Sequence, residues 1–311
     1  MVDPQSPLTQ PDGPLPPVDL TNCDREPVHA PAAIQPFGAV LVARRSDRRI
    51  THASDNLSHW IGLDARAAIG RDLAAVVGPE RADEIGARAA GGGLEGNPFP
   101  VGPLPTGAPA GTVHLTAHTA GEHLIVTAEP AAGATGAADL ALMKHAIERL
   151  RVSDGVPDLC ARLAEEVRML TGFDRVMVYR FHPDHSGEVV AEAARAGLPA
   201  YLGLNYPAAD IPAPAREIYK KVWVRVIPDA AAPAVPLVPP GTGAGSVDLT
   251  HCPLRAVSPI HVEYLTNMGV TATMSLSLLS GTELWGLVAC HHYSPRRLPG
   301  DTRTVCEVVA Q

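Results

Sequence analysis

The stretch YPAADIPAPAREIYKKVWVR, residues 206–225, constrains the fold more than any other part of this chain. Pro212 disfavours the α conformation at the residue before it, so the backbone around Asp210 is expected to be extended and fixed. Pro214 suits a first helical turn, and the pattern that follows predicts a helix up to Trp223. A rigid, irregular backbone ahead of a helix is a good place to aim carbonyl groups at a ligand. The alternative is an ordinary loop before a helix, with Asp210 as a solvated turn residue.

Length and composition set broad limits. The 311 residues suggest two domains, and a hydrophobic content of 46% is enough for packed cores. The net charge of −8 argues against non-specific binding to nucleic acid or membranes. No apolar run approaches about 20 residues, and the N-terminal residues lack the basic and apolar regions of a secretory signal. A cytoplasmic location is therefore expected, with no nucleic-acid or membrane partner.

The cysteines form an odd-numbered set without CxxC spacing, which fits reduced thiols better than a disulfide framework. They are Cys23, Cys160, Cys252, Cys290 and Cys306. A nucleophilic thiolate needs positive neighbours, but beside Cys23 the charge of Arg25 is opposed by Asp24 and Glu26. Local sequence therefore leaves Cys23 as either an inert exposed thiol or a reactive one.

The order of the expected elements divides the chain into two α+β domains joined by a helix. Residues 1–20 are rich in proline and are expected to be extended or disordered. Residues 21–136 contain short strands, then short helices, then a strand pair separated by Gly121. The glycine- and proline-rich tract ahead of that pair is expected to be a surface loop, because no Lys-Ser or Lys-Thr closes it as a phosphate loop. Residues 137–153 predict the linking helix, and residues 154–311 form the second domain.

The second domain is expected to begin with an amphipathic helix and to continue with strands. One apolar stripe of that helix contains Leu159, Leu163, Val167 and Leu170. Residues 228–249 then form a loop rich in proline and glycine, and a loop of about twenty residues inside a compact domain usually signals a special role.

A second helix is expected to run from Ser258 to Gly269, with the serine as N-cap and a proline at the first helical position. Its spacing places four residues on one face, namely His261, Tyr264, Leu265 and Met268. An all-apolar face would indicate plain core, whereas a histidine and a tyrosine on it suggest a lined pocket. A single core histidine with its hydrogen bonds satisfied is the alternative.

The segment YPAADIP resembles the PASDIP-type signature of bacterial phytochromes, and three further blocks resemble the same family in the expected order. These blocks are NCDREPVHAPAAIQPFG (22–38), LRAVSPIHVEYLTNMGV (254–270) and LWGLVACHH (284–292). The resemblance implies a PAS-like domain followed by a GAF domain, each an antiparallel sheet with flanking helices. It also implies that the loop 228–249 wraps the N-terminal segment in a figure-eight knot, with Ile34 in the threaded part.

The resemblance implies that the second domain holds biliverdin, a linear tetrapyrrole attached covalently as a thioether to Cys23. Arg225 and Arg255 match the family's partners for the two propionates, since arginine binds carboxylates bidentately. Each is otherwise interpreted as a surface charge, although both lie between apolar neighbours. The hydroxyl donors that match the family around the propionates are Tyr219, Ser258, Thr273 and Ser275.

The resemblance also assigns roles around the pyrrole rings. The backbone carbonyl of Asp210, in the Asp-Ile-Pro motif with Ile211 and Pro212, accepts from the pyrrole N–H groups. His261 lies against the rings on the helix face shared with Met268, and His291 bonds the carbonyl of ring D. The residues expected around ring D are Tyr179, Tyr206 and Tyr264. His291 and His292 are adjacent on an expected strand and point to opposite faces, so they make a poor metal chelate.

Three positions depart from the family pattern. Phe37 stands where the IQPHG block usually has histidine, and Ala209 replaces the serine of PASDIP. Ile260 occupies the position where plant and cyanobacterial members carry their bilin-linking cysteine. This last departure leaves Cys23 as the attachment site that matches the family, and it favours biliverdin over phycocyanobilin.

The implied function is a red/far-red photoreceptor module in which light isomerises the double bond between rings C and D, converting the Pr and Pfr states. The chain is expected to be a sensory fragment that ends after the GAF domain and is not itself an enzyme. A PHY domain and an output module, often a histidine kinase, would follow, and a homodimer through GAF and linker helices is expected. The alternatives are a GAF domain that binds a cyclic nucleotide or another small effector, and an engineered near-infrared fluorescent derivative.

Overall fold

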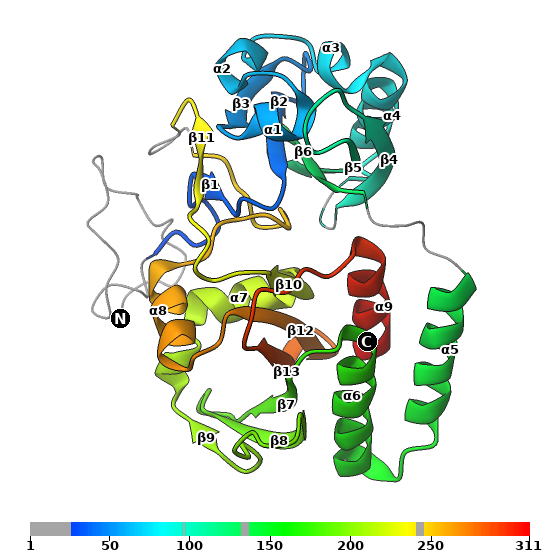
Figure 1. Ribbon diagram of the computed structural model, residues 1–311, viewed down its shortest axis with the longest axis vertical. Helices are drawn as coiled ribbons and strands as arrows, with labels where there is room; N and C mark the ends of the chain where they lie inside the picture. The colour runs from blue at the N-terminus through cyan, green and yellow to red at the C-terminus, as the bar shows by residue number, and fades with distance from the viewer. Residues whose placement is uncertain (1–25, 95, 97, 132–136, 241–245) are drawn as a thin grey trace, which may run out of the picture.

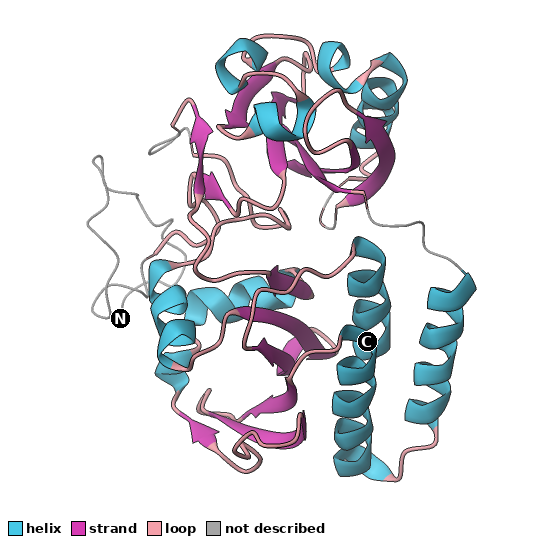
Figure 2. Ribbon diagram, viewed as in Figure 1, coloured by secondary structure: helices cyan, strands magenta, loops and turns pink. Residues whose placement is uncertain are grey.

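The computed structural model describes residues 26–94, 96, 98–131, 137–240 and 246–311. The chain folds into two lobes stacked along its long axis, each built on an antiparallel sheet with flanking helices (Figure 1). Helices and strands are mixed in both lobes, so the α+β class expected from the sequence is confirmed (Figure 2). Among the described helices, none combines the length and the apolar character needed to cross a membrane.

The first lobe is built on a sheet of seven strands in the order β1-β11-β3-β2-β6-β5-β4. Its buried core fills the space between this sheet and four helices, which follow one another after β3. The strands are β1 (Ala33–Ile34), β2 (Ala39–Arg44), β3 (Ile50–Ser54), β4 (Phe99–Pro105), β5 (Thr112–Ala120), β6 (His123–Pro130) and β11 (Val235–Val238). The helices are α1 (Leu57–Ile61), α2 (Ala65–Ala68), α3 (Ala74–Val77) and α4 (Pro79–Ala90).

The second lobe is built on a sheet of six strands in the order β10-β12-β13-β7-β8-β9. Its strands are β7 (Arg175–Phe181), β8 (Gly187–Ala194), β9 (Asn205–Tyr206), β10 (Val224–Ile227), β12 (Ala272–Ser280) and β13 (Glu283–His292). Its helices are α5 (Ala137–Arg151), α6 (Gly155–Thr171), α7 (Ala213–Lys221), α8 (Pro259–Asn267) and α9 (Gly300–Ala310), with one 3₁₀ turn, η2 (Ala208–Asp210).

The two faces of the second sheet are covered differently. Helices α5, α6 and α9 lie together on one face and bury the main core of the lobe there (Figure 1). Helices α7 and α8 lie on the other side of the lobe, where smaller clusters replace a continuous core. The expected apolar stripe of α6 is buried at Leu163 and Val167 and partly buried at Leu170, whereas Leu159 is 39% exposed. The sheet face covered by α5, α6 and α9 is therefore fully packed, whereas the face toward α7 and α8 leaves room for a cavity.

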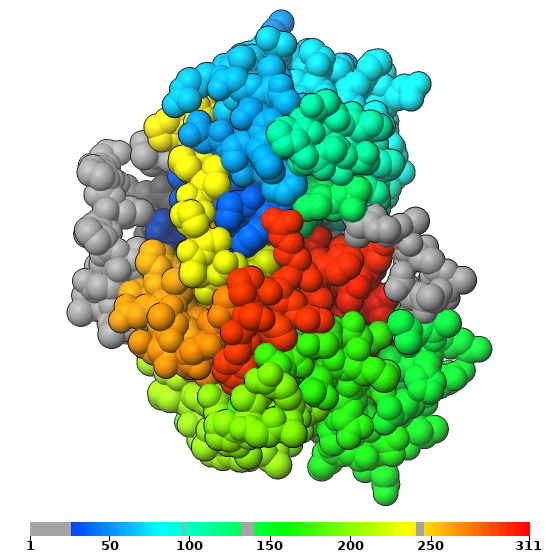
Figure 3. Space-filling model, in the orientation of Figure 1, coloured from blue at the N-terminus to red at the C-terminus, as the bar shows by residue number. Residues whose placement is uncertain are grey.

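The lobes meet where the N-terminal segment crosses the segment between β10 and α8. Strand β1 pairs with β11, which in turn pairs with β3 of the first sheet. On its other side, Gln35 N–H donates to the carbonyl of Leu254 at 2.6 Å, and Ala256 N–H donates to the carbonyl of Ala33 at 3.1 Å. Ile34 is fully buried at this crossing. In the space-filling view the segment that contains β11 lies over the N-terminal segment at the junction of the lobes (Figure 3).

Two segments that the sequence indicated as loops contain strands. The tract before β5, expected to be a surface loop, includes β4, which has prolines at positions 100, 103 and 105. β4 is an edge strand, where a proline need not donate to a neighbour, and its register shifts between Pro100 and Gly102. The loop 228–249 likewise contributes β11 to the first sheet. The sequence did not indicate this strand, because its partners β1 and β3 lie far away in sequence.

His118 of β5 is a buried histidine at the junction of the lobes. It is 1% exposed, and neither ring nitrogen has a partner among the described residues. Its ring centroid lies 6.2 Å from that of His251, which belongs to the segment before α8. Burial lowers the pKa of His118 to about 3, the charge of His251 adds to the effect, and Asp248 opposes it.

Acid should therefore weaken the fold through His118. Because the folded pKa is about 3 and the ordinary value is 6.5, the unfolded chain binds this proton first as the pH falls. The free energy of unfolding should decrease from pH 6.5 downward, by up to about 1.4 kcal/mol per pH unit from this residue. Urea denaturation at pH 7, 6 and 5 measures the slope, which His118→Phe should reduce. An equal slope in the variant would contradict this account.

Candidate ligand-binding site

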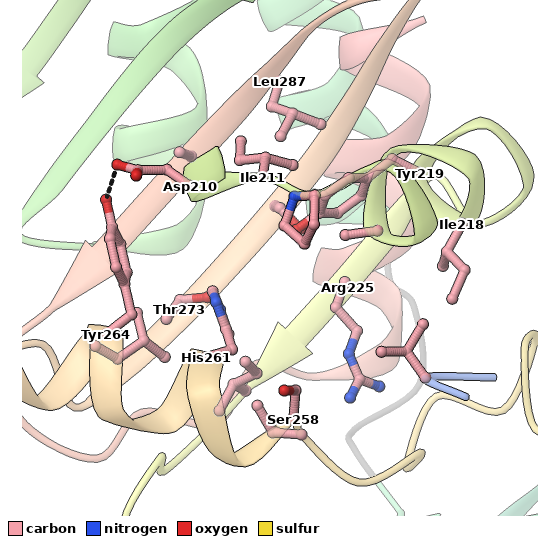
Figure 4. A pocket seen from close by; sticks show the side chains of 18 of the residues that line it. Asp210, Ile211, Ile218, Tyr219, Arg225, Ser258, His261, Tyr264, Thr273 and Leu287 are labelled. Carbon is pink, nitrogen blue, oxygen red and sulfur yellow. Dashed lines mark hydrogen bonds between the residues drawn. The ribbon is translucent and has the colours of Figure 1, made fainter. Parts of the chain in front are cut away.

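A cavity of about 390 Å³ lies in the second lobe between the sheet, helices α7 and α8, and residues 26–31 (Figure 4). Every described residue that the sequence suggested for the site lines this one cavity. They are Tyr179, Tyr206, Asp210, Ile211, Pro212, Tyr219, Arg225, Arg255, Ser258, His261, Tyr264, Met268, Thr273, Ser275 and His291. Cys23, the expected attachment residue, lies outside the described part of the chain.

Strand register brings polar side chains from separate strands together on the cavity face. Arg225 of β10 is directly opposite Ser275 of β12, and Thr273 of β12 is directly opposite His291 of β13. Directly paired residues on neighbouring strands point to the same face of a sheet. The rest of this wall is mainly apolar, with Met177, Val189, Ile227, Leu287 and Ala289 among its residues.

Two guanidinium groups at the cavity wall donate to backbone carbonyls, and to no other acceptor in the described part of the chain. Arg225 donates to the carbonyls of Pro253 at 3.2 Å, of Ala256 at 3.3 Å and of Arg255. Arg255 is 7% exposed and donates to the carbonyl of Thr250 at 3.2 Å. Among the described residues, neither guanidinium has a carboxylate within salt-bridge distance. Both cations are therefore fixed in position without an acidic partner.

Electrostatics disfavours these charges in the absence of a counter-ion. Burial lowers the pKa of Arg225 to about 9, and the neighbouring charge of Arg255 adds to the effect. Burial also lowers the pKa of Arg255. At neutral pH both remain charged, so the cavity contains two positive charges that an anionic ligand would stabilise.

Two histidines on the wall are neutral at pH 7. Burial lowers the pKa of His261 to about 4, with the charge of Arg225 contributing. Burial likewise lowers the pKa of His291 to about 4, followed by the charges of Arg175 and His261. His291 is 9% exposed and its Nδ1 has no partner among the described residues. A neutral imidazole offers one donor and one acceptor, so both rings are suited to hydrogen-bond a polar ligand group.

Three tyrosines form the far end of the cavity, near Asp210. The phenol of Tyr264 donates to Asp210 Oδ2 at 3.3 Å (Figure 4), and the rings of Tyr179 and Tyr206 are 6.1 Å apart. Burial raises the pKa of Tyr179 to about 12, with the charge of Asp210 adding. Burial also raises the pKa values of Tyr206 and Tyr264. All three phenols are therefore protonated donors at physiological pH.

The structure corrects two local expectations. Asp210 ends the 3₁₀ turn η2 and does not lie in extended backbone; the extended residue is Ile211, with φ −126° and ψ 87°. The proline after Ile211 restricts only its immediate neighbour, which leaves Asp210 free to complete the turn. Ser258 occupies the N-cap position of α8 as expected, but its side chain makes no capping hydrogen bond.

Sequence reasoning missed two residues at the site. Arg216 of α7 donates to the carbonyl of Ile211 at 2.5 Å and so fixes the turn that contains Asp210. Glu26 lines the cavity and accepts a hydrogen bond from Ser258 Oγ at 2.5 Å. The only signal for Glu26 was its place three residues after Cys23, where it was weighed solely as a charge that opposes Arg25.

His292 points away from the cavity, as the alternation of a strand requires. Its Nδ1 lies 3.0 Å from Asp174 Oδ2, and its ring packs edge-on against Phe173. In the described ranges, no group of three histidine, cysteine, aspartate or glutamate side chains is arranged to hold a metal ion.

Comparison with family models and curated proteins places two domains in this chain. Residues 23–131 match the PAS fold, and residues 156–311 match the GAF domain. The chain is 39% identical over 301 residues to a bacteriophytochrome of Pseudomonas aeruginosa, covering 95% of this chain. It is 38% identical over 308 residues to cyanobacterial phytochrome B of Nostoc, covering 94% of this chain. The chain spans 40% of the length of each of these relatives.

Solved structures resemble the whole arrangement. The chromophore-binding domain of an unusual bacteriophytochrome from R. palustris superposes with a TM-score of 0.83 at 35% identity, covering 93% of this chain and 95% of that one. The chromophore-binding domain of Stigmatella aurantiaca phytochrome P1 gives a TM-score of 0.84 at 37% identity, covering 93% of this chain and 97% of that one.

The hydrogen bond between Tyr264 and Asp210 should contribute to the stability of the ligand-free chain. Tyr264→Phe removes the donor, and we expect the free energy of unfolding to fall by about 0.5–1.5 kcal/mol. Denaturation in urea measures the change. Tyr293→Phe is the control, because no hydrogen bond of that hydroxyl is formed among the described residues. Equal effects of the two substitutions would argue against a stabilising bond.

Proposed function

The chain belongs to the phytochrome family, as a PAS–GAF chromophore-binding unit, and from this we propose that its cavity binds biliverdin and senses red and far-red light. The observation that carries the proposal is the pair of guanidinium groups, Arg225 and Arg255, fixed at the cavity wall with no acidic partner in the described chain. A buried cation is stabilised by a carboxylate that it can bind bidentately.

The donor set of the cavity fits a long, mostly apolar molecule with two acidic groups. Two separate guanidinium groups and the hydroxyls of Tyr219, Ser258 and Ser275 suit two carboxylates. The apolar wall suits conjugated rings, and the unpartnered Nδ1 of His291 suits a polar atom of a ring. A cyclic nucleotide brings a single phosphate, which would leave the second cation without a partner. The geometry therefore supports a di-acid such as biliverdin over a cyclic nucleotide.

Each remaining site residue has a role in holding the pigment. The Asp210 carbonyl, fixed by the turn η2, would accept from pyrrole N–H groups, and Ile211 and Pro212, which line the cavity, would pack against the rings. His261 and Met268 lie on the α8 side, and Thr273 provides a hydroxyl on the strand side. Bound biliverdin supplies a double bond between its rings C and D that isomerises on absorbing light. Tyr179, Tyr206 and Tyr264 would surround ring D, and His291 would hydrogen-bond its carbonyl.

Attachment is proposed at Cys23, through a thioether to the vinyl group of ring A. The structure describes the chain from Glu26 onward, and residues 26–31 reach the cavity at Glu26, Val28 and Pro31. Ile260 also lines the cavity, so the position before His261 carries no thiol that could compete.

The longer relatives suggest a role for the whole protein. We propose that this unit is the sensory part of a signalling protein that continues into a PHY domain and an output module such as a histidine kinase. A homodimer through α5, α6 and α9 fits the apolar side chains exposed on these helices. These are Leu140, Leu142, Val156, Leu159, Met169 and Val308.

Mixing the purified chain with biliverdin tests the proposal directly. We expect a red absorbance band that survives denaturation and a zinc-induced fluorescent band on a gel. Cys23→Ser should abolish the covalent adduct and leave non-covalent binding of the pigment. An undiminished adduct would assign the attachment to another thiol, and no pigment binding at all would reject the proposed function.

The two arginines should be needed for affinity. Arg225→Gln and Arg255→Gln should each weaken biliverdin binding by about 10- to 100-fold, because each loses a charge-assisted hydrogen bond. Titration followed by absorbance in a Cys23→Ser background measures this loss. Arg180→Gln is the control, since Arg180 pairs with Glu188 away from the cavity. Unchanged affinity in both arginine variants would remove the main support for a di-acid ligand.

The far-red state should be incomplete in this 311-residue chain. In the family, the aspartate at the position of Asp210 pairs with an arginine of the PHY domain in that state. Here its carboxylate accepts instead from Tyr264. We expect red light to convert only part of the sample to the far-red state, and that state to decay rapidly in darkness. Absorption spectroscopy measures both the extent of conversion and the decay. A complete and long-lived far-red state would contradict this expectation.

A further inference from the structure

Glu26 lies at the edge of the cavity and is bound to the helix that supplies much of its wall. Its Oε2 accepts a hydrogen bond from Ser258 Oγ at 2.5 Å, at the start of α8. Among the described residues that line the cavity, only Glu26 and Asp210 are acidic, and Asp210 is bonded to Tyr264. Glu26 therefore accepts a hydrogen bond from Ser258, a residue whose hydroxyl is also a proposed donor to the ligand.

Ser258 forgoes a local bond to make this contact. A serine at an N-cap normally accepts a hydrogen bond from a backbone N–H in the first turn of its helix. Here the Ser258 side chain makes no such bond, and its hydroxyl donates to Glu26 instead. Ser258 also lines the cavity together with Arg255, so a ligand carboxylate bound there would accept a hydrogen bond from the same hydroxyl.

The bond also fastens a segment that is otherwise only lightly held. From His29 onward the N-terminal segment is anchored by backbone bonds, for example from Leu249 N–H to the carbonyl of His29 at 2.7 Å. Residues 26–28 make backbone bonds only within the segment in the described part of the chain. Among the described hydrogen bonds, the one between Ser258 and Glu26 alone connects residues 26–28 to the second lobe.

We propose that Glu26 is a gate for a carboxylate of the ligand. Without a ligand, the Glu26 carboxylate accepts the hydrogen bond of the Ser258 hydroxyl, and this bond must break when a ligand carboxylate takes its place. This inference rests on the proposed function, since it concerns an acidic ligand in the same cavity. Exchange of the one carboxylate for the other frees residues 26–28 from α8. Ligand entry is thereby coupled to release of the segment that directly follows Cys23 in the sequence.

The gate should depend on the charge of Glu26. Burial raises the pKa of Glu26, and the bond from Ser258 opposes the shift. The ionised carboxylate repels an incoming carboxylate, and protonation below the raised pKa removes that repulsion. The other charged side chains among the described residues that line the cavity are Arg225, Arg255 and Asp210, and the shift of the Glu26 pKa comes from burial and Ser258. The association rate in the native chain should therefore rise as the pH falls from 8 toward 5.

Stopped-flow mixing with biliverdin tests this prediction. Glu26→Gln keeps an acceptor for Ser258 and removes the charge, so association at pH 7.5 should be about three- to fivefold faster. Its rate should also lose most of the rise toward pH 5 seen in the native chain. Glu307→Gln is the matched control, because Glu307 is another half-buried glutamate whose pKa is raised by burial and which does not line the cavity. An unchanged or slower rate in Glu26→Gln, or an unaltered pH profile, overturns the gate.

A second measurement needs no pigment. In the ligand-free chain, Glu26→Ala should speed hydrogen exchange at the amides of Val28 and Ala30, whereas Glu26→Gln should leave it near the native rate. Equal exchange in the native chain and Glu26→Ala would show that the bond does not hold the segment, and would overturn the gate. If the native chain binds no biliverdin at all, the proposed function fails, and the exchange experiment still decides whether Glu26 fastens the segment.

Discussion

Two positive charges fixed in place by backbone carbonyls determine how the rest of this structure is used. The carbonyls that hold Arg225 and Arg255 belong to the turn of residues 250–256. That turn is itself fixed by the N-terminal segment, through the backbone bonds of residues 33–35 and through the Gln35 side-chain amide, which donates to the carbonyl of Arg255 at 3.4 Å. The crossing of the lobes therefore does more than join them, because it aims both guanidinium groups at the cavity.

The other ionisable groups of the cavity leave these two charges dominant. Burial keeps His261 and His291 neutral and the three tyrosines protonated at pH 7. Each of the two acidic residues in the described lining already has a hydrogen-bond donor, Tyr264 for Asp210 and Ser258 for Glu26. A ligand with two carboxylates that enters the cavity therefore meets two fixed cations, and its uncharged part meets neutral hydrogen-bonding side chains. Both guanidinium groups are held in place before a ligand arrives, so the two cations themselves need little reorganisation on binding.

Sequence reasoning worked where a pattern acts locally and failed where a distant partner decides. Periodicity located α6, the Ser258-Pro259 start and Gly269 located α8, and the alternation of β13 correctly separated His291 from His292. The strand β4 was missed because its prolines are tolerated only at a sheet edge, and nothing local marks an edge. The side chain of Ser258 was expected to cap α8, but a carboxylate more than two hundred residues away takes its hydroxyl.

The sequence by itself determined the α+β character of the two domains, because periodicity and proline act over a few neighbours. The motif around Asp210 and the residues expected at the site came from its resemblance to the phytochromes. Only the tertiary structure decided that fifteen of those residues face one cavity, since strand register selects which alternate side chains meet. It also decided that Arg225 and Arg255 lack acidic partners in the described chain and that Glu26 reaches Ser258. These facts depend on contacts between segments far apart in sequence, and no local pattern encodes them.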